Sequence, residues 1–379
     1  MKILMSSPSV RIPAKIAQSI HQMEFYENLT KMGHEVDIIA REGKGETDID
    51  IKKVFSKDIP LARLFFNIDT GFKLRKLLKK NDYDIIHDRG YLFGGTATKL
   101  ANNHDLPVVL QIDDDWIEME HRHSNYLNLP IMNGYAKKFC RSLIDRTDWS
   151  FTVSKTLRKI IRDSWGGDTS TIDVIPNGVN PEQFVPMKKS NHLKEKYDLK
   201  GKTMVFVGKL GPWHGIDTLL KAAPKIKKEY PEFKVVIVGG DQKDVAKYSK
   251  MAGDEIVFTG KVPYKEVRKY INLGDICVAP YPDVDYGFSP FKIFEYMACE
   301  KPVLASDLPS LREILSEDTA ILTKPGDPDK LAENTIDAFN RDLTKMGKNA
   351  RQKVNENYTW KKSTEKLVDL YEKAIEDHS

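Results

Sequence analysis

An acidic side chain interrupts an apolar helical stretch in SPFKIFEYMA, residues 289–298. Glu295 stands on a segment of Phe, Ile, Met and Ala residues, where an unpaired carboxylate would be unfavourable to desolvate. Just upstream, Ser289 and Pro290 indicate a loop that enters a helix N-terminus, where unpaired N–H groups and the helix dipole favour an anion. A carboxylate beyond an anion site predicts a ligand with both phosphate and hydroxyl groups, and a sugar nucleotide is the obvious candidate.

A second group of polar residues follows the apolar run MVFV, in GKLGPWHGIDTLL, residues 208–220. Gly208 and Gly215 flank a turn in which Lys209 and His214 precede a helix. Such side chains can neutralise a diphosphate leaving group, because charge develops on the phosphate oxygens as a glycosidic bond breaks. The alternative is a plain connecting loop with solvated polar residues, since strand, glycine loop and helix follow one another in many α/β proteins.

A basic, aromatic-rich stretch occupies residues 52–80, with nine Lys or Arg residues against two Asp residues. Leu and Phe residues are interleaved with the basic ones. Such an amphipathic stretch is typical of a surface that rests on an anionic membrane, as a lipid-linked acceptor would require. A packed helix with a solvated basic face is the alternative.

The composition describes a globular protein: of 379 residues, 40% are hydrophobic and 30% charged, with a net charge of +4. The length fits two domains, and the charge is too small to indicate a nucleic-acid partner. The three cysteines are isolated and lack CxxC spacing, which favours a reducing compartment and argues against structural zinc. Apolar runs such as VVIVGG are far shorter than the roughly 20 residues of a membrane-spanning helix.

Short apolar runs alternate with helical segments along both halves of the chain. Lys2–Met5 is a predicted strand, followed by a predicted helix over residues 14–32. Further strand-length runs recur over residues 84–153 and again over residues 204–322, which argues for parallel sheets covered on both faces. Between them, residues 174–186 (VIPNGVNPEQFVP) contain Pro residues and an Asn-Gly pair, which are typical of turns and loops. Two doubly wound halves are therefore expected, with ligands bound beyond the carboxyl ends of the strands.

Four stretches occur in the order and at the spacing of the family 4 retaining glycosyltransferases of the GT-B fold, which this chain resembles. They are VIPNGVNPEQF, VGKLGPWHG, VPYKEVRKYINLGDICVAPY and SPFKIFEYMACEKPVLASDLPSLREI. KMGHEVDIIA and YTWKKSTEKLVDLYEKAI are also similar to that family, and W-H-G and S-P-x-K-x-F-E-Y mark a subset of it. The resemblance implies an α/β GT-B fold, with two Rossmann-like doubly wound domains facing a central cleft. Residues 1–182 would form the acceptor-side domain, residues 183–357 the nucleotide-sugar-binding domain, and residues 358–379 a helix that crosses back to the first domain.

The resemblance also implies roles for single residues. Glu295 falls on the family's second glutamate, which hydrogen-bonds the ribose. Lys209 stands where the family usually has arginine and His214 where it has lysine, and His214 is cationic only if a phosphate raises its pKa above about 6.5. The family's first glutamate would fall at Gly287, so Ser289 and nearby N–H groups are expected to hold the sugar or phosphate. The implied donor contacts are Gly208, Lys209, His214, Val262, Ser289, Pro290, Phe291, Lys292 and Glu295.

Three consecutive aspartates, Asp113, Asp114 and Asp115, follow the apolar run VVLQI, where the family often has a histidine. A D-x-D metal site of the other glycosyltransferase fold would bind a divalent ion through hard oxygens, whereas GT-B needs no metal. Alternatively, Asp113 or Asp114 orients the acceptor hydroxyl or the sugar, or the run caps a helix. Arg89 either faces the same cleft or forms a salt bridge with this loop, and His87 is expected to be structural.

Together these features predict transfer of a sugar from a nucleotide-diphosphate donor, UDP or GDP, with retention of configuration and without a metal or cofactor. The acceptor would be a hydroxyl of a glycan, glycolipid or polysaccharide. The candidate catalytic residues are Lys209, His214, Asp113 and Asp114. A sugar-nucleotide epimerase, a phosphorolytic enzyme and a non-catalytic nucleotide-sugar-binding subunit are the alternatives, because fold does not fix chemistry. A cytoplasmic location is expected, with peripheral contact to the inner membrane face through residues 52–80.

Overall fold

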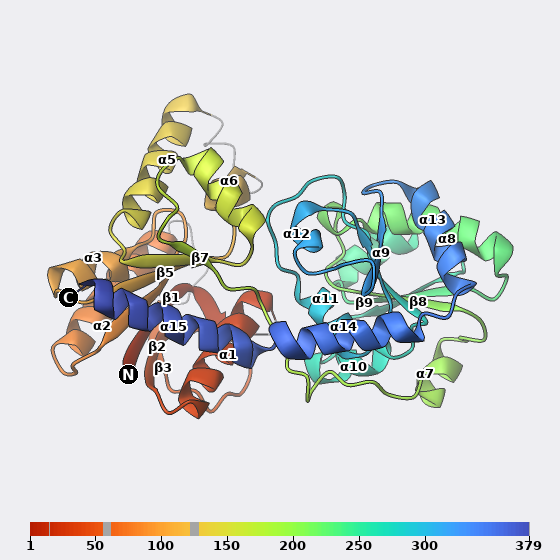
Figure 1. Ribbon diagram of the computed structural model, residues 1–379, viewed down its shortest axis with the longest axis horizontal. Helices are drawn as coiled ribbons and strands as arrows, with labels where there is room; N and C mark the ends of the chain where they lie inside the picture. The colour runs from red at the N-terminus through yellow and green to blue at the C-terminus, as the bar shows by residue number, and fades with distance from the viewer. Residues whose placement is uncertain (15, 56–61, 122–128, 379) are drawn as a thin grey trace. The chain divides into compact units, whose positions relative to one another are not determined.

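The computed structural model describes residues 1–14, 16–55, 62–121 and 129–378. The chain forms two compact units (Figure 1). The N-terminal unit comprises Met1–Asn177, Tyr286–Phe288 and Trp360–Ser379, and the C-terminal unit comprises Gly178–Asp285 and Ser289–Thr359. The chain first passes from one unit to the other within the stretch of Pro and Asn-Gly punctuation that the sequence shows at residues 174–186.

The N-terminal unit is built on a parallel seven-stranded sheet of order β3-β2-β1-β4-β5-β6-β7. Its strands are β1 (Lys2–Ile12), β2 (Glu35–Glu42), β3 (Ile51–Val54), β4 (Ile85–Arg89), β5 (Val108–Ile112), β6 (Trp149–Thr152) and β7 (Ile172–Val174). Its helices are α1 (Ala17–Lys31), α2 (Ala62–Leu78), α3 (Thr96–Asn103), α4 (Trp116–His121), α5 (Pro130–Ile144), α6 (Lys155–Trp165) and α15 (Trp360–His378). The central strands β4 and β5 are buried along their whole length, as parallel strands covered on both faces must be.

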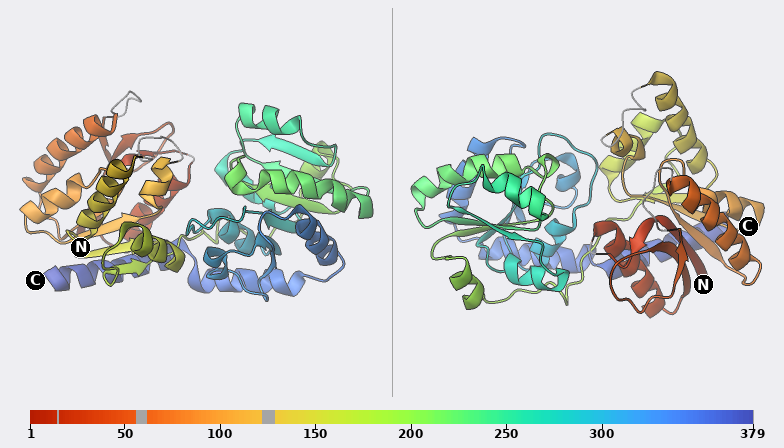
Figure 2. Two further views of the ribbon diagram at one scale, coloured as in Figure 1. Left: turned by 90° about the horizontal axis from the view of Figure 1, so that it is seen from above. Right: turned by 180° about the vertical axis from the view of Figure 1, so that it is seen from behind.

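The C-terminal unit repeats this plan with a parallel six-stranded sheet of order β10-β9-β8-β11-β12-β13. Its strands are β8 (Thr203–Val207), β9 (Lys234–Val238), β10 (Ile256–Gly260), β11 (Ile276–Ala279), β12 (Val303–Ser306) and β13 (Ala320–Thr323). Its helical elements are α7 (Asn191–Lys196), the 3₁₀ turn η2 (Pro212–His214), α8 (Ile216–Glu229), α9 (Gln242–Ser249), α10 (Tyr264–Ile271), α11 (Phe291–Ala298), α12 (Pro309–Arg312), α13 (Pro328–Phe339) and α14 (Thr344–Asn357). Helices cover both faces of each sheet, as the further views show (Figure 2). The predicted fold class, two doubly wound Rossmann-like α/β domains, is confirmed.

The C-terminal helix α15 packs on the N-terminal unit against α1, β5 and β6 (Figure 1). Ser363 donates a hydrogen bond to the carbonyl of Pro176 (2.7 Å), and Trp149 donates its indole N–H to Asp377 (2.7 Å). The side chain of Tyr371 is fully buried. Helix α15 is therefore part of the core of the N-terminal unit. Within the described ranges, no helix has both the length and the apolar character that crossing a bilayer demands.

Candidate functional site

In the C-terminal unit, β8 and β11 are neighbours at the point where the strand order reverses. Doubly wound sheets bind their ligands at this point, beyond the carboxyl ends of the strands. The loop that begins at Gly208 leaves β8 here, and the chain after β11 leads to α11. The two sequence motifs with candidate donor residues therefore lie in the same unit and on neighbouring strands.

Lys292 is the least ordinary side chain at this edge, because its ammonium group is buried without a hydrogen-bond partner among the described residues. Its Nζ lies 4.1 Å from the ring centroid of Phe206 and 5.3 Å from that of Tyr281. It also lies 2.9 Å from the place that a Cβ at Gly208 would take, where φ is +147°. Burial lowers the pKa of Lys292 to about 7, against the opposing effect of Glu295. The site thus holds a cation that lacks a counter-ion within hydrogen-bond distance.

Glu295 lies one turn further along α11 and is 4% exposed. Tyr264, the first residue of α10, donates its hydroxyl to Oε1 of Glu295 at 2.9 Å. Burial raises the pKa of Glu295 to about 7, although Tyr264 and Lys292 both act to lower it. Tyr264 was not a predicted site residue; its signal in the sequence is a hydroxyl-bearing aromatic residue at the helix start within VPYKEV.

His214 ends the 3₁₀ turn η2, and its Nδ1 is buried without a hydrogen-bond partner in the described part of the chain. Burial, together with the charges of Lys292 and Lys209, lowers the pKa of His214 to about 2. The imidazole is therefore neutral in this environment. Lys209 is exposed at the start of the same loop.

The remaining predicted donor residues lie on two loops of the C-terminal unit. Pro290 is the extended residue before α11, and its carbonyl accepts the first helical bond, from Ile293 N at 3.1 Å. Ser289 is buried, Phe291 is half-buried, and Val262 is half-buried in the loop before α10. Ser289, Pro290 and Phe291 thus lie at the beginning of α11, Gly208 follows the end of β8, and Val262 lies on a separate loop.

The structure explains why no glutamate stands at Gly287. Its φ is +69°, and a Cβ there would lie 2.5 Å from Cα of Leu157. Ser154, which caps α6, also donates its hydroxyl to the carbonyl of Gly287 at 2.6 Å. An acidic side chain at this position would require the backbone to move.

A polar cluster lies at the ends of β4 and β5 in the N-terminal unit. Arg89 Nη2 lies 2.9 Å from Asp113 Oδ2, so the predicted alternative of a salt bridge is confirmed. Gln111 Nε2 donates to Asp113 Oδ1 at 2.8 Å. Burial acts to raise the pKa of Asp113, but Arg89, His21 and Gln111 together lower it below its ordinary value. Asp113 is therefore held as a carboxylate whose side chain is 14% exposed.

The three aspartates differ in what they do. Asp115 caps α4, because its Oδ1 accepts from the N–H groups of Ile117 (3.0 Å) and Glu118 (3.3 Å). The helix-cap interpretation therefore holds for Asp115, and Asp114 is half-buried beside it. No group of three or more His, Cys, Asp or Glu residues in the described ranges has the geometry to hold a metal ion. His87 is structural as expected, since it is fully buried and both ring nitrogens are hydrogen-bonded.

Family models match both halves of the chain. Residues 18–183 match a model described as Glycosyltransferase Family 4, and residues 201–341 match one described as Glycosyl transferases group 1. The first range contains Arg89 and Asp113, and the second contains Lys292 and Glu295. The chain is built from two glycosyltransferase domains.

Two relatives of this glycosyltransferase are about a quarter identical to it in sequence over the aligned residues. An uncharacterized glycosyltransferase of Methanocaldococcus jannaschii is 26% identical over 84% of this chain and 80% of its own length. The phosphatidyl-myo-inositol mannosyltransferase of Mycolicibacterium smegmatis is 25% identical over 98% and 94%. Among solved structures, the sucrose-phosphate synthase of Thermosynechococcus elongatus is similar with a TM-score of 0.78 at 20% identity, covering 98% of both chains. Anabaena HepE in complex with UDP and glucose has a TM-score of 0.73 at 16% identity, covering 97% and 98%. These similarities confirm the predicted GT-B fold.

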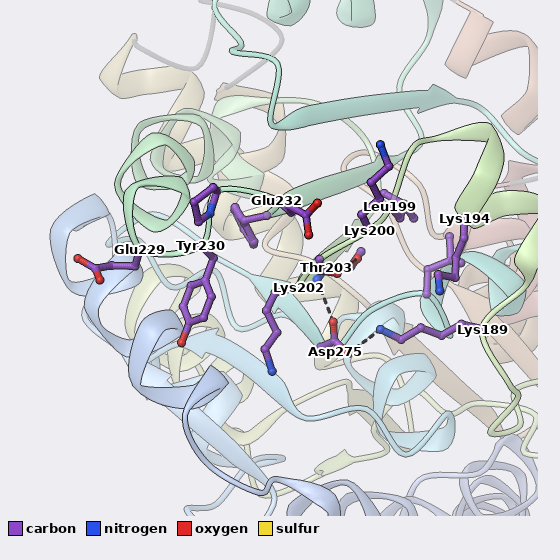
Figure 3. A pocket seen from close by; sticks show the side chains of 14 residues that line it. Lys189, Lys194, Leu199, Lys200, Lys202, Thr203, Glu229, Tyr230, Glu232 and Asp275 are labelled. Carbon is purple, nitrogen blue, oxygen red and sulfur yellow. Dashed lines mark hydrogen bonds and ion pairs between the residues drawn. The ribbon is translucent and has the colours of Figure 1, made fainter.

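A cavity of about 480 Å³ lies at the opposite, amino-terminal end of the strands in the glycosyltransferase's C-terminal unit (Figure 3). Lysines and acids line it together. Lys189 Nζ is 2.5 Å from Asp275 Oδ1, and Thr203 N donates to Asp275 Oδ2 at 2.9 Å (Figure 3). Lys202 donates to the carbonyl of Phe339 at 3.4 Å. Because Lys189, Lys202 and Asp275 already have partners, the cavity is a weaker candidate than the carboxyl ends of the strands beside Lys292.

Proposed function

We propose that this glycosyltransferase moves a sugar from a nucleotide-diphosphate donor to a hydroxyl of a glycan, glycolipid or polysaccharide, with retention and without a metal. The observation that carries the proposal is the buried ammonium of Lys292, which has no hydrogen-bond partner among the described residues and lies against Gly208. A diphosphate beside Gly208 supplies the missing counter-charge and restores the protonated form of the lysine. The cation then stabilises the departing diphosphate as the glycosidic bond breaks.

The other donor residues have complementary tasks in this proposal. Glu295, oriented by Tyr264, accepts hydrogen bonds from the ribose hydroxyls. Lys209 supplies further positive charge to the diphosphate, and neutral His214 supplies a hydrogen bond to the diphosphate or the sugar. Ser289, Pro290, Phe291 and Val262 line the donor.

On the acceptor side, Asp113 orients the attacking hydroxyl, with Asp114 beside it. The salt bridge with Arg89 keeps Asp113 ionised, which a hydrogen-bond acceptor for a hydroxyl requires. UDP or GDP is the proposed nucleotide, and a structural neighbour whose title names UDP supports the first. The phosphatidyl-myo-inositol name of a relative supports a lipid-linked acceptor.

Nucleotide sugars test the donor site directly. We expect a UDP- or GDP-sugar, but not an ADP-sugar, to raise the melting temperature by at least a few degrees. The shift should persist in chelator, because no metal takes part. A thermal-shift panel with and without EDTA measures both effects, and a GT-B protein of known donor tested in parallel is the control. No shift with any nucleotide sugar would contradict the proposal, and product formed without an acceptor would indicate an epimerase.

The described part of the basic stretch supports peripheral membrane contact at the cytoplasmic face. Residues 56–61 and the side chains of residues 62–66 lie outside what the structure describes. On the rest of α2, Leu74 is buried, whereas Phe72 is 66% exposed and Ile68 is 51% exposed. Arg75, Lys76, Lys79 and Lys80 are exposed on or just after the same helix. Exposed apolar side chains beside basic ones fit an anionic bilayer surface.

The exposed apolar surface continues beyond α2. Asn67 donates to the carbonyl of Phe93 (3.1 Å), and the ring of Phe93 stacks on Tyr135 of α5 at 5.9 Å. Tyr135 is 59% exposed and Ile131 is 85% exposed. Exposed apolar residues therefore occur on both α2 and α5, and contacts through Asn67, Phe93 and Tyr135 link the two helices.

Replacing Phe72 by serine tests this surface. We expect binding to vesicles of anionic phospholipid to weaken about tenfold, because an exposed phenyl ring contributes on the order of 1.5–3 kcal/mol when buried. Co-sedimentation with vesicles at low and high salt is the measurement. Met251→Ser is a matched control, because Met251 is 57% exposed in the C-terminal unit. Equal vesicle binding by both variants would contradict membrane contact through α2.

A further inference from the structure

A row of buried polar side chains lies in the interior of the N-terminal unit. Arg89 pairs with Gln111 in the register of β4 and β5, and His87 and Asp113 lie two residues before and after them on the same face of the sheet. Tyr371 of α15 packs against this face. His87, Gln111 and Tyr371 are each 0% exposed, so each polar group needs a partner within the protein.

The hydrogen bonds along this row all point in one direction. Tyr371 and His87 Nδ1 are 2.5 Å apart, His87 Nε2 and Gln111 Oε1 are 2.8 Å apart, and Gln111 Nε2 is 2.8 Å from Asp113 Oδ1. An amide oxygen only accepts, so His87 Nε2 must carry the hydrogen. In a neutral imidazole Nδ1 then accepts, which makes the Tyr371 hydroxyl the donor. Each donor in the chain therefore faces toward the carboxylate.

The orientation of the Gln111 amide is fixed from both sides. Its nitrogen must face the Asp113 carboxylate, which only accepts, and its oxygen also accepts from Gln22 Nε2 at 2.8 Å. Gln22 in turn accepts from the Ser7 hydroxyl at 2.7 Å. If the amide were reversed, its oxygen would face the Asp113 carboxylate and its nitrogen would face the Gln22 amide nitrogen. The Asp113 carboxylate therefore determines the direction of the hydrogen-bond chain.

We infer that Tyr371, His87 and Gln111 are positioning residues, whose hydrogen-bond chain orients the Asp113 carboxylate toward the acceptor hydroxyl. The inference rests on the proposed function of Asp113. Arg89 holds one carboxylate oxygen and Gln111 the other, so the plane of the carboxylate is fixed. Apolar residues of similar volume would pack the same space without polar groups to satisfy. The row ends at Asp113, whose side chain remains 14% exposed. We therefore assign the buried hydrogen bonds the task of orienting this carboxylate.

Three groups face Asp113 from the elements around it: Arg89 on β4, Gln111 on β5 and His21 on α1, whose Nδ1 lies 3.7 Å from Oδ1. Burial lowers the pKa of both His21 and His87 to about 4, so both are neutral near neutral pH. Because these two histidines titrate in the same acid range as an aspartate, the pKa of Asp113 itself is read from its carboxyl ¹³C shifts.

Replacing Tyr371 by phenylalanine removes the first donor and keeps the ring. We expect kcat to fall roughly tenfold with the donor KM unchanged, because the acceptor hydroxyl is oriented less well. The acid limb of the pH profile should move to higher pH, because a weaker donor at Asp113 stabilises its ionised form less. Tyr83→Phe is the matched control: Tyr83 is also buried in this unit, and its hydroxyl donates to Asp37 at 2.7 Å. It should lose stability without either kinetic change.

Two NMR measurements test the hydrogen-bond chain independently of transferase activity. In wild-type protein with ¹⁵N-labelled histidine, His87 should show a protonated Nε2 and an unprotonated Nδ1, with H87Q for assignment. In Tyr371→Phe, the pKa of Asp113 from carboxyl ¹³C shifts should rise. The opposite tautomer, an unchanged pKa of Asp113, or a folded variant with wild-type kcat and pH profile would overturn the inference. If Tyr371→Phe does not fold, Gln111→Met cuts the same chain. An inactive wild type that shows the expected tautomer and pKa would contradict the proposed function alone.

Discussion

Lys292→Met is expected to weaken donor binding strongly while making the protein more stable. Burial lowers the pKa of Lys292 from 10.5 to about 7, so the fold stabilises the neutral amine and destabilises the cation. Because the folded pKa lies below the unfolded one, this loss of stability is full below about pH 7 and disappears as the pH rises through the unfolded value. Methionine keeps an unbranched apolar side chain beside Phe206 and removes the buried charge. We expect a melting temperature a few degrees higher at pH 7.

The same substitution should weaken binding of the nucleotide sugar by about a hundredfold or more, because a buried charge pair is lost. It should lower kcat/KM at least as much, since charge on the leaving diphosphate is no longer stabilised. Differential scanning calorimetry and titration calorimetry measure the two effects. Most core substitutions destabilise, so a gain of stability with a loss of binding marks a residue kept for its ligand.

Lys301 provides a matched control in the same unit. It is half-buried and its pKa is also lowered by burial, but its Nζ donates to the carbonyl of Asn272 at 3.2 Å. Lys301→Met should therefore leave donor affinity unchanged and should not stabilise the fold. Unchanged donor affinity in Lys292→Met would remove Lys292 from the donor site and with it the main support for the proposed function.

The fold was largely predictable because buried parallel strands have short, continuous apolar sequences. The apolar runs VVLQI and MVFV lie in β5 and β8, and the predicted strand Lys2–Met5 lies in β1. The elements missed were β3 and β7, which have four and three residues and lack a continuous apolar run. β1 extends to Ile12, past the predicted end at Met5, through residues such as Arg11 that do not look like an interior strand. The last residues of β1 belong to the sheet because they pair with β2, and the local sequence does not show that pairing.

The donor residues were predictable for a different reason from the acceptor residues. Lys292 and Glu295 occur in one short motif, so their spacing on one helix shows that they lie together. Gln111 and Tyr371 are 260 residues apart in number, and no local pattern joins them. A partial signal existed, since two buried strands carry polar residues toward their carboxyl ends: β4 ends in His87, Asp88 and Arg89, and β5 contains Gln111. Polar residues in a buried strand indicate a hydrogen-bond network, but the partner on α15 is found only once the fold is known.

Donor affinity is expected to be greatest near pH 7 and to fall on both sides. Binding needs Lys292 protonated for the diphosphate and Glu295 ionised for the ribose hydroxyls, and burial brings the pKa of each to about 7. The diphosphate raises the pKa of Lys292, so affinity is lost as the pH rises above 7. The ribose hydroxyls lower the pKa of Glu295, so affinity is lost as the pH falls below 7. Each limb should approach about tenfold per pH unit.

Measurements of proton linkage and two variants show which residue causes each limb of the pH dependence of donor affinity. Titration calorimetry in buffers of different ionisation enthalpy should show proton uptake on binding above pH 7 and proton release below it. The ligand should be a nucleotide sugar, because a terminal phosphate itself titrates near pH 6. Lys292→Met should remove the alkaline limb from the residual binding, and Glu295→Gln the acid limb. His214, whose pKa is lowered to about 2, does not titrate in this range in the free protein. A donor affinity that stays constant across this range would mean that neither buried group contacts the nucleotide, and the donor would then have to bind elsewhere on the C-terminal unit.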